Sequence, residues 1–275
     1  MVQFQVAGVS ARVEFAAAPR LAANLLPWQV PECGSAPDLT LQVLLDSAPP
    51  NAPLLPPSGG HVNMSVVRQP DGFWFQRLAG LMHASADFSC CRAWTPAGSP
   101  LQEEAFHGRP WLMLALWGHL SCRGGALLHG AVCALGGRYF LLLGDQQVGK
   151  STLAHLVVQA GGSCLTDEYP ALTWHDDAPW THGVPWPGMT GPPIPLSGLL
   201  AAAFFVRPAP DNLVQRLSLF QAGSRLLSNT RFFVWNSSTI PPVLELLNFT
   251  TRAVPVYEFG FVPAPSAVEA LREAL

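Results

Sequence analysis

The sequence has little charge, and lysine is almost missing from it. Only 12% of its 275 residues are charged, 49% are apolar, and Lys150 is the single lysine. Because composition alone rarely identifies an interface, we interpret this scarcity as a compositional bias. A buried partner surface is the alternative interpretation, and a homo-oligomer is compatible with either.

A surplus of positive charge and a long apolar run are both missing. The net charge of −3 leaves no basic footprint for a nucleic acid or for an anionic membrane. No apolar run approaches the roughly 18–20 residues that span a bilayer. We therefore expect no nucleic-acid partner and no membrane partner.

Export and metal-binding signals are missing as well. The first residues lack the basic start and the apolar core of a signal peptide. Without such a signal, we expect a cytoplasmic protein whose six cysteines are reduced. No pair has CxxC spacing, and a zinc site at Cys90-Cys91 is only a weak alternative to a strand with one thiol inward and one outward.

Residues 1–105 are expected to form a β-rich domain with a scaffold or substrate role. Short alternating segments there are separated by turn residues, and no catalytic constellation is present. The expected strands are Val2–Val6 and Ala11–Phe15 in a hairpin, Leu39–Leu45, His61–Arg68 and Gly72–Arg77 in a second hairpin, and Ala84–Ala93, with a loop over Ser47–Gly60.

Residues 106–275 are expected to form a second domain in which strands and helices alternate, so the fold class is α/β, or α+β for the whole chain. Apolar runs and turn residues predict the boundaries, with a Pro-rich loop over Trp180–Pro195 and Ser266 as an N-cap. The expected strands are Ala126–Ala134, Arg138–Leu143, Ser163–Thr166, Ala202–Val206 and Val256–Phe261, and the expected helices are Trp111–Cys122, Ser151–Gln159, Leu217–Leu227 and Ser266–Leu275.

One segment carries a specific phosphate-binding pattern, because it fits G-x-x-x-x-G-K-[ST] at every defined position between a buried strand and a helix. Its glycines let backbone N–H groups face phosphate oxygens, and the helix N-terminus adds positive potential. The lysine suits the β- and γ-phosphates of ATP, and the serine hydroxyl suits Mg²⁺. The predicted nucleotide-binding residues are Gly144, Asp145, Gln146, Gln147, Val148, Gly149, Lys150, Ser151 and Thr152.

Two acidic residues, Asp167 and Glu168, follow the strand after the phosphate-loop helix. Ligands of open parallel sheets bind at the carboxyl ends of strands, so this pair is expected beside the loop. Phosphoryl transfer needs carboxylates to hold Mg²⁺ and to accept a hydroxyl proton. The alternative interpretation is a solvated acidic turn.

His129 precedes the strand pair that leads into the loop. A histidine among apolar residues is more often a hydrogen-bonded core residue than a catalyst. The order of His129, the phosphate loop and the acidic pair along the chain nevertheless resembles that of one family, HPr kinase/phosphorylase. The fold of this family is a P-loop variant related to phosphoenolpyruvate carboxykinase. The resemblance is specific over Leu127–Leu172, and beyond it the chain is similar to short HPr-kinase-like serine kinases of ribosomal and lasso peptide biosynthesis clusters.

The resemblance implies roles for individual residues. Lys150 contacts the transferring phosphate, Ser151 and Asp167 hold the metal, Glu168 is the base, and His129 helps to position the nucleophile. Because the family usually has Asp-Asp where this chain has Asp-Glu, the roles within the acidic pair stay open. Glutamines 146 and 147 replace the small residues common in the family's loop.

The resemblance also implies an assisting arginine, with Arg207, Arg225 and Arg231 as candidates. The Arg-Gly-rich segment of true HPr kinases is missing, so we do not expect a bifunctional HPr kinase/phosphorylase. Pro185-Trp186-Pro187-Gly188 is either a substrate-binding lip or a packed turn.

The expected activity is a Mg²⁺- and ATP-dependent kinase that phosphorylates a serine of a peptide or small protein. A kinase for a small-molecule alcohol and a nucleotide-binding accessory protein are the alternatives.

Overall fold

A computed structural model describes residues 1–15, 25–31, 35–44, 49, 52–53, 55, 64–77, 80–95, 109–186 and 188–275. Contacts divide the chain into two compact units, residues 1–122 with 233–237, and residues 123–232 with 238–275. The domain boundary expected between residues 105 and 106 lies outside the described residues, as do Cys33 and most of the loop expected over Ser47–Gly60. None of the described helices is long and apolar enough to cross a membrane.

The first unit is built on a mixed sheet of the order β1-β2-β3-β7-β6-β5-β4. Strand β3 pairs in parallel with β2 and β7, and the other neighbours are antiparallel. Helix α3 (Arg109–Cys122) packs on β3, and a 3-10 turn spans Leu26–Trp28. The strands are β1 (Val2–Val6), β2 (Val9–Phe15), β3 (Leu39–Leu44), β4 (Met64–Gln69), β5 (Gly72–Arg77), β6 (Gly80–Ala84) and β7 (Cys90–Trp94).

Both expected hairpins of this unit are confirmed, as is the inward and outward placement of Cys91 and Cys90. The single strand expected over Ala84–Ala93 is wrong. A turn separates β6 from β7, and the Asp87 carboxylate closes it by accepting the Ser89 N–H at 3.1 Å. The five described cysteines are free in the structure.

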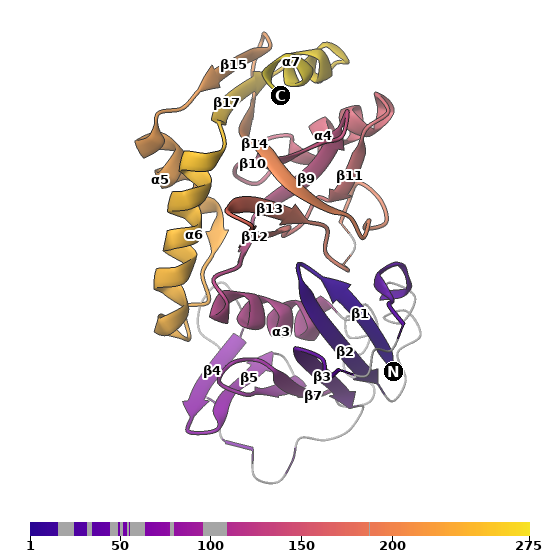
Figure 1. Cartoon of the computed structure of the whole chain (residues 1–275), viewed down its shortest axis with the longest axis vertical. Helices are drawn as coiled ribbons and strands as arrows, with labels where there is room; N and C mark the ends of the chain where they lie inside the picture. The colour runs from indigo at the N-terminus through magenta and orange to yellow at the C-terminus, as the bar shows by residue number, and fades with distance from the viewer. Residues whose placement is uncertain are drawn as a thin grey trace. The chain divides into compact units, whose positions relative to one another are not determined.

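The second unit contains the other sheet, whose main path runs β11-β9-β10-β14-β13-β12-β8-β16. Strand β17 pairs with β14 and β15, and the parallel pairs are β10–β14 and β14–β17. With helices between these strands, the chain is an α/β protein (Figure 1). The strands are β8 (Ala126–Leu128), β9 (Gly130–Leu135), β10 (Arg138–Leu143), β11 (Ser163–Thr166), β12 (Ala171–His175), β13 (Ala178–His182), β14 (Ser197–Pro208), β15 (Leu213–Arg216), β16 (Thr230–Arg231) and β17 (Val256–Phe261).

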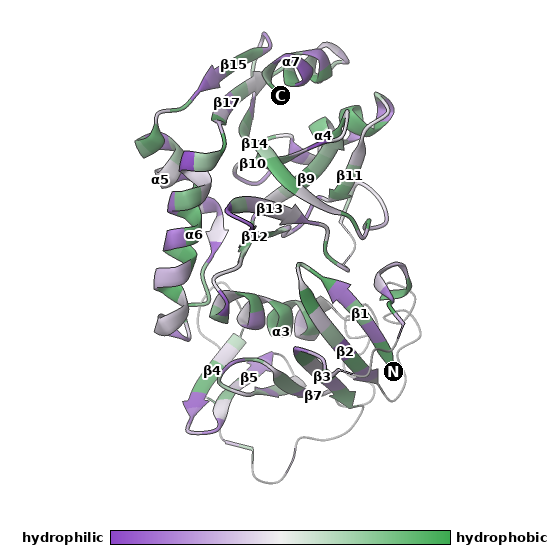
Figure 2. Ribbon diagram, in the orientation of Figure 1, coloured by the Kyte–Doolittle hydropathy of each residue, from purple (hydrophilic) through white to green (hydrophobic). Residues whose placement is uncertain are grey.

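Helices cover both faces of this sheet because β10 is apolar on both sides. Phe140 and Leu142 belong to the core beneath α4 and α7, whereas Leu141 and Leu143 belong to the core beneath α5 and α6. Figure 2 shows hydrophobic residues along β14 and alternating hydropathy along α6. The helices are α4 (Lys150–Gln159), α5 (Leu219–Asn229), α6 (Ile240–Ala253) and α7 (Ser266–Ala274), with a 3-10 turn at Ser237–Thr239.

Three expectations for this unit are wrong in detail. The strand expected over Ala126–Ala134 breaks at His129 into β8 and β9. The loop expected over Trp180–Pro195 begins inside β13, which forms a hairpin with β12 through Asp176 and Asp177 at positive φ. Pro265, rather than Ser266, is the N-cap of α7, and the Ser266 hydroxyl instead accepts a bond from Asn212 at 2.9 Å.

Candidate active site

The phosphate loop joins β10 to α4, as its sequence pattern predicts. Gly149 ends the loop at a φ of +94°, and a Cβ there would lie 2.8 Å from the Phe261 ring. A side chain would therefore meet both backbone strain and a packed aromatic. Gln147 also has a positive φ, +63°, a conformation that is uncommon for a residue with a Cβ.

Lys150, the first residue of α4, folds its side chain into the loop. Its Nζ donates to the carbonyls of Gly144 at 2.7 Å and Asp145 at 2.5 Å. Burial lowers the pKa of Lys150, and the charge of Asp145 opposes this shift. The lysine side chain is only 9% exposed, so its ammonium group is aimed at the loop and not at bulk solvent.

His129 lies in the break between β8 and β9, beside the start of the loop, because Gly130 pairs with Leu143 across the β9–β10 ladder. Its Nε2 is 3.4 Å from Lys150 Nζ. An ammonium group only donates, so Nε2 accepts and the neutral ring carries its proton on Nδ1. Nδ1 is buried and has no hydrogen-bond partner among the described residues, so the contact of His129 with the loop is made through Nε2.

The electrostatic surroundings of His129 favour its neutral form. Burial lowers the pKa of His129 first, and the positive charges of Lys150 and Arg231 lower it further. Asp145 acts in the opposite direction. The histidine is therefore neutral at pH 7 and can donate through Nδ1 or accept through Nε2.

The sheet brings Asp167 and Glu168 to the edge that holds His129. Strand β11 runs antiparallel to β9, so the residues after Thr166 return toward the start of β9. The Leu128 N–H donates to the Pro170 carbonyl at 3.0 Å, and the ring centres of Tyr169 and His129 lie 5.7 Å apart.

The Asp167 carboxylate holds the loop that follows Trp186. It accepts the Met189 N–H at 2.9 and 3.0 Å and the Thr190 hydroxyl at 2.6 Å. A Cβ on Gly188 would overlap this carboxylate. Since a carboxylate has about four acceptor sites, these bonds leave room for one further partner.

The Glu168 main chain is also fixed. Its carbonyl accepts the Trp186 indole N–H at 2.8 Å and the Thr166 hydroxyl at 3.2 Å. The Trp186 side chain is fully buried. Of the two interpretations of this Pro- and Trp-rich stretch, Trp186 therefore fits the packed turn, while Pro187 lies outside the described residues.

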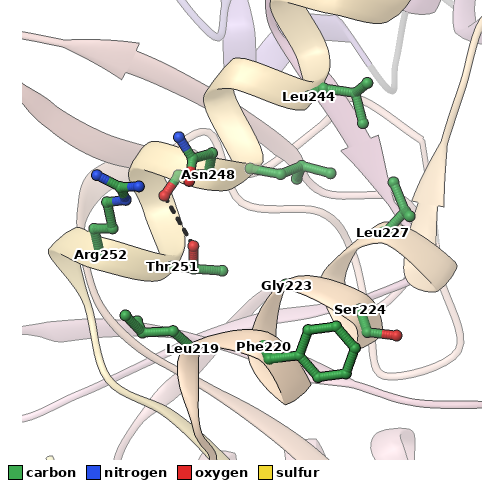
Figure 3. A pocket seen from close by; sticks show the side chains of 10 residues that line it. Leu219, Phe220, Gly223, Ser224, Leu227, Leu244, Asn248, Thr251 and Arg252 are labelled. Carbon is green, nitrogen blue, oxygen red and sulfur yellow. Dashed lines mark hydrogen bonds between the residues drawn. The ribbon is translucent and has the colours of Figure 1, made fainter.

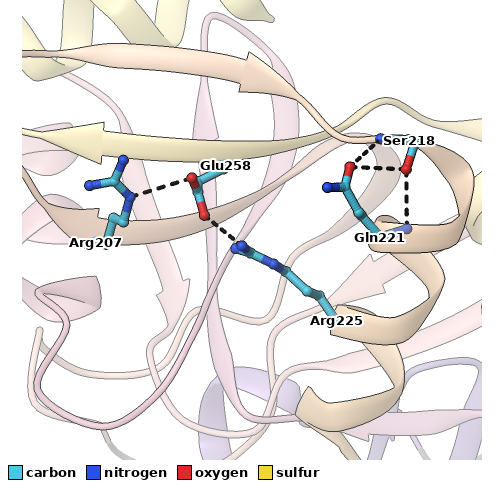
Figure 4. A network of polar contacts seen from close by, with 5 residues as sticks. All are labelled: Arg207, Ser218, Gln221, Arg225 and Glu258. Carbon is cyan, nitrogen blue, oxygen red and sulfur yellow. Dashed lines mark hydrogen bonds and ion pairs between the residues drawn. The ribbon is translucent and has the colours of Figure 1, made fainter.

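Contacts distinguish the three candidate arginines. Arg207 and Arg225 both form ion pairs with Glu258, at 3.4 and 2.6 Å (Figure 4). These pairs hold the pKa of the Glu258 carboxyl below its usual range, and the hydrogen bond from Arg225 is the main cause. Arg231 instead lies over the Tyr169 ring, 5.2 Å from its centre, and donates to the Tyr169 hydroxyl at 3.0 Å. Of the three, only Arg231 contributes to the lowered pKa of His129.

Sequence analysis missed Asn229, which joins the end of α5 to the loop. Its side-chain oxygen accepts the Gly144 N–H at 3.1 Å, and its carbonyl accepts the His129 N–H at 2.7 Å. Its amide donates to the Arg225 carbonyl at 3.1 Å. One buried residue thus sets the positions of both the loop and the histidine, and its distance of 85 residues from Gly144 leaves no local sequence signal.

Two oxygen donors, the Ser151 hydroxyl and the Asp167 carboxylate, are of the type that suits a hard cation. Ser151, in the first turn of α4, offers a hydroxyl, and Asp167 keeps one acceptor site. Mg²⁺ takes oxygen ligands and usually keeps several waters, so one carboxylate and one hydroxyl fit it. The described residues contain no cluster of three or more His, Cys, Asp or Glu, as a dedicated all-protein metal site would require.

No protein-family model matches the chain, and no curated protein matches it. The solved structure of the Hpr(Ser) kinase/phosphatase from Coxiella burnetii is similar over 54% of this chain and 94% of its own length, at 12% sequence identity and a TM-score of 0.33.

Proposed function

We propose that the chain is a Mg²⁺-dependent kinase that transfers the γ-phosphoryl group of ATP to a serine hydroxyl of a peptide or small protein. The main support is one arrangement, in which Lys150 Nζ is folded into the phosphate loop and is 3.4 Å from His129 Nε2. The acidic pair ends a strand at the same edge of the sheet. A phosphate cradle, a proton-carrying ring and carboxylates together match hydroxyl phosphorylation.

In this proposal, backbone N–H groups between Asp145 and Thr152 bind the phosphates, Asn229 holds the Gly144 N–H, and the N-terminus of α4 contributes positive potential. Lys150 exchanges its two carbonyl partners for phosphate oxygens. Ser151 and Asp167 hold Mg²⁺, which neutralises phosphate charge when bound. His129 accepts from Lys150 through Nε2 and so helps to position the ammonium group beside the reacting phosphate.

Glu168 is the proposed base. Its carboxylate accepts the proton of the serine hydroxyl while the serine oxygen bonds to the γ-phosphorus. The bond from that phosphorus to the β–γ bridging oxygen breaks, and ADP leaves. The alternative assignment, with Asp167 as the base, is less favoured because its oxygens already accept three bonds from Met189 and Thr190.

The proposal is tested with γ-labelled ATP, Mg²⁺ and single-serine peptides. We expect label on the peptide with the unchanged chain and none with Lys150→Ala. Glu168→Gln should remove transfer while nucleotide binding, measured by titration, stays within about twofold. If Asp167→Asn alone has this effect, the two carboxylates have exchanged roles.

One observation favours a second candidate function, a nucleotide-binding accessory protein. The engagement of Asp167 with Thr190 and Met189 could leave the metal too weakly held for transfer. In that case ATP binds, depends on Lys150, and labels neither a peptide nor any alcohol in a panel of small hydroxyl compounds. Label on a small alcohol only would identify the acceptor class as wrong while leaving the kinase intact.

A further inference from the structure

A groove of about 560 Å³ lies between α5 and α6 of the second unit. Figure 3 shows Leu227 and Leu244 at one end and Leu219 and Arg252 at the other. This volume lies within the range of about 300–1,000 Å³ that is typical of ligand sites. The groove is therefore large enough for several side chains of a partner.

Exposed apolar side chains concentrate around this groove. Phe220 is 85% exposed and Leu219 is 64% exposed, and Leu227 and Leu244 are also exposed. Single exposed apolar residues are ordinary on protein surfaces, but a contiguous cluster beside a cavity is typical of a binding surface.

The two helices that form the groove are held in place by the core on which their inner faces pack. A capping box between Ser218 and Gln221 begins α5, and Ala222 and Leu226 anchor its inner face in the core. Helix α6 buries Val243 and Leu246 in the same core. A partner that docks there gains contacts without first ordering the groove.

Helix α5 connects the groove directly to the candidate active site. Leu227 lies two residues before Asn229, whose side chain bonds Gly144 of the phosphate loop. The near end of the groove is therefore on the order of 10–15 Å from the loop. An extended chain covers this distance with roughly three to five residues.

The charge of the groove restricts its occupant. Arg252 is the one charged residue among those that line it, and no hydrogen bond or ion pair among the described residues uses its guanidinium group. Two copies docked groove to groove would bring two arginines together without an acidic partner. A single cation is also too little for attachment to an anionic membrane. An apolar partner with a carboxylate complements the groove.

We infer that the α5–α6 groove docks a segment of the acceptor peptide, with apolar side chains between the helices and a carboxylate on Arg252. This inference rests on the proposed kinase function and specifies its substrate class. Arg252 lies at the end of the groove that is farther from the phosphate loop. We therefore expect the peptide to carry, in this order, the serine, a spacer, the apolar residues and the acidic residue. The groove runs eight residues along α5, about 12 Å, so roughly four extended residues separate its two ends.

Gly223 provides a matched pair of variants. A Cβ on Gly223 would have no neighbouring atom within 4 Å, so a side chain can leave the backbone there, and Gly223→Trp places a large ring in the groove. Gly223→Ala changes the helix but leaves the groove open, and it should raise the melting temperature because alanine favours helices. Equal folding of both variants is checked by circular dichroism.

The probes are fluorescein-labelled peptides with one serine, a spacer of three to five residues, two leucines and a glutamate. Matched peptides carry glutamine for both leucines, or lysine for the glutamate. Affinities are measured by fluorescence anisotropy without ATP. Relative to the unchanged chain, we expect the affinity for the first peptide to fall about tenfold in Gly223→Trp and to stay the same in Gly223→Ala. Arg252→Glu should weaken the glutamate peptide and strengthen the lysine peptide.

Phosphorylation then separates the docking proposal from the kinase proposal. We expect Gly223→Trp to raise KM for the peptide about tenfold while KM for ATP and kcat stay unchanged. If neither Gly223→Trp nor the exchange of the leucines changes phosphorylation of the peptide, the docking proposal is overturned and the proposed kinase function stands. Peptide binding that is lost in Gly223→Trp, without transfer to any serine, overturns the kinase and leaves the groove. A dimer that Phe220→Ser dissociates, with no peptide bound, overturns docking in favour of self-association.

Discussion

At the scale of single residues, Asn229 carries the contact between α5 and the phosphate loop. Asn229→Ala removes the acceptor of the partly buried Gly144 N–H, so we expect a loss of about 1–3 kcal/mol in the free energy of unfolding and weaker ATP binding. Asn229→Asp keeps an acceptor but adds negative charge beside the phosphates. It should weaken ATP binding more than it lowers stability.

Ser228→Ala is the control for both Asn229 variants, because it removes a 3.4 Å partner of the same amide without affecting the Gly144 contact. Thermal unfolding and nucleotide titration measure the two effects. Wild-type ATP affinity in both Asn229 variants would show that the loop does not depend on this bond.

Arg231 gives a second prediction at this scale, through the pKa of His129. Burial first, then Lys150 and Arg231, lower this pKa, so the ring stays neutral until the pH falls below about 6.5. Arg231→Gln removes one positive charge, makes protonation easier and raises the pKa. The acid limb of the pH–rate profile should therefore move to higher pH, and the histidine NMR titration should move with it.

Arg207→Gln is the matched control for this shift. It also removes a positive charge, but Arg207 pairs with Glu258 and does not contribute to the pKa of His129. An equal shift in both variants would mean that net charge, and not the local position of Arg231, sets the titration.

At the scale of elements, Gly149 shows why the turn into α4 needs glycine. At Gly149 the backbone φ is +94°, and an added Cβ would lie 2.8 Å from the Phe261 ring. At Gly161 the φ is +85°, and an added Cβ would have no neighbour within 4 Å. Gly149→Ala and Gly161→Ala both carry a backbone cost of about 1–2 kcal/mol, and only the first must also displace the ring. We expect Gly149→Ala to lose more stability by chemical denaturation, and it alone to lose ATP binding. Equal losses of stability would exclude a role for Phe261.

The elements around the loop were predictable because their signals are local. Apolar runs, the Gly136-Gly137 turn and the phosphate pattern predict β10, α4 and β11 from a few neighbouring residues each. Helix α6 was not predicted, since Pro241-Pro242 resembles a helix break. Proline fits the first turn of a helix, where its missing N–H has no partner to lose, and the structure places both prolines there.

The candidate site was predictable only in part for the same reason. His129, Lys150, Asp167 and Glu168 lie within 40 residues of one another in one hairpin–helix–strand unit, and their order indicated a shared edge. Asn229 and Arg231 reach that edge through pairing of β16 with β8, a contact between segments about 100 residues apart. No periodicity or motif records such a pairing.

At the scale of the whole molecule, the chain leaves the second unit at Phe233 and returns to it after Ser237. Phe233 is 1% exposed and packs within the first unit against Phe73, Phe88 and Trp117, with ring centres 4.8–6.2 Å apart. Phe→Ala at such a position costs about 3–5 kcal/mol. The described packing thus predicts that Phe233→Ala destabilises the first unit selectively.

Calorimetry can separate the two units because ATP stabilises only what binds it. We expect ATP with Mg²⁺ to raise the unfolding temperature of the second unit, and Phe233→Ala to lower that of the first. Lys150→Ala should abolish the shift caused by ATP without altering the transition that Phe233→Ala moves. A single transition that ATP and Phe233→Ala shift in opposite directions would mean that the units unfold together. The segment 233–237 would then couple the phosphate site to the aromatic core covalently, because its residues belong to the first unit and the chain continues into the second unit at both of its ends.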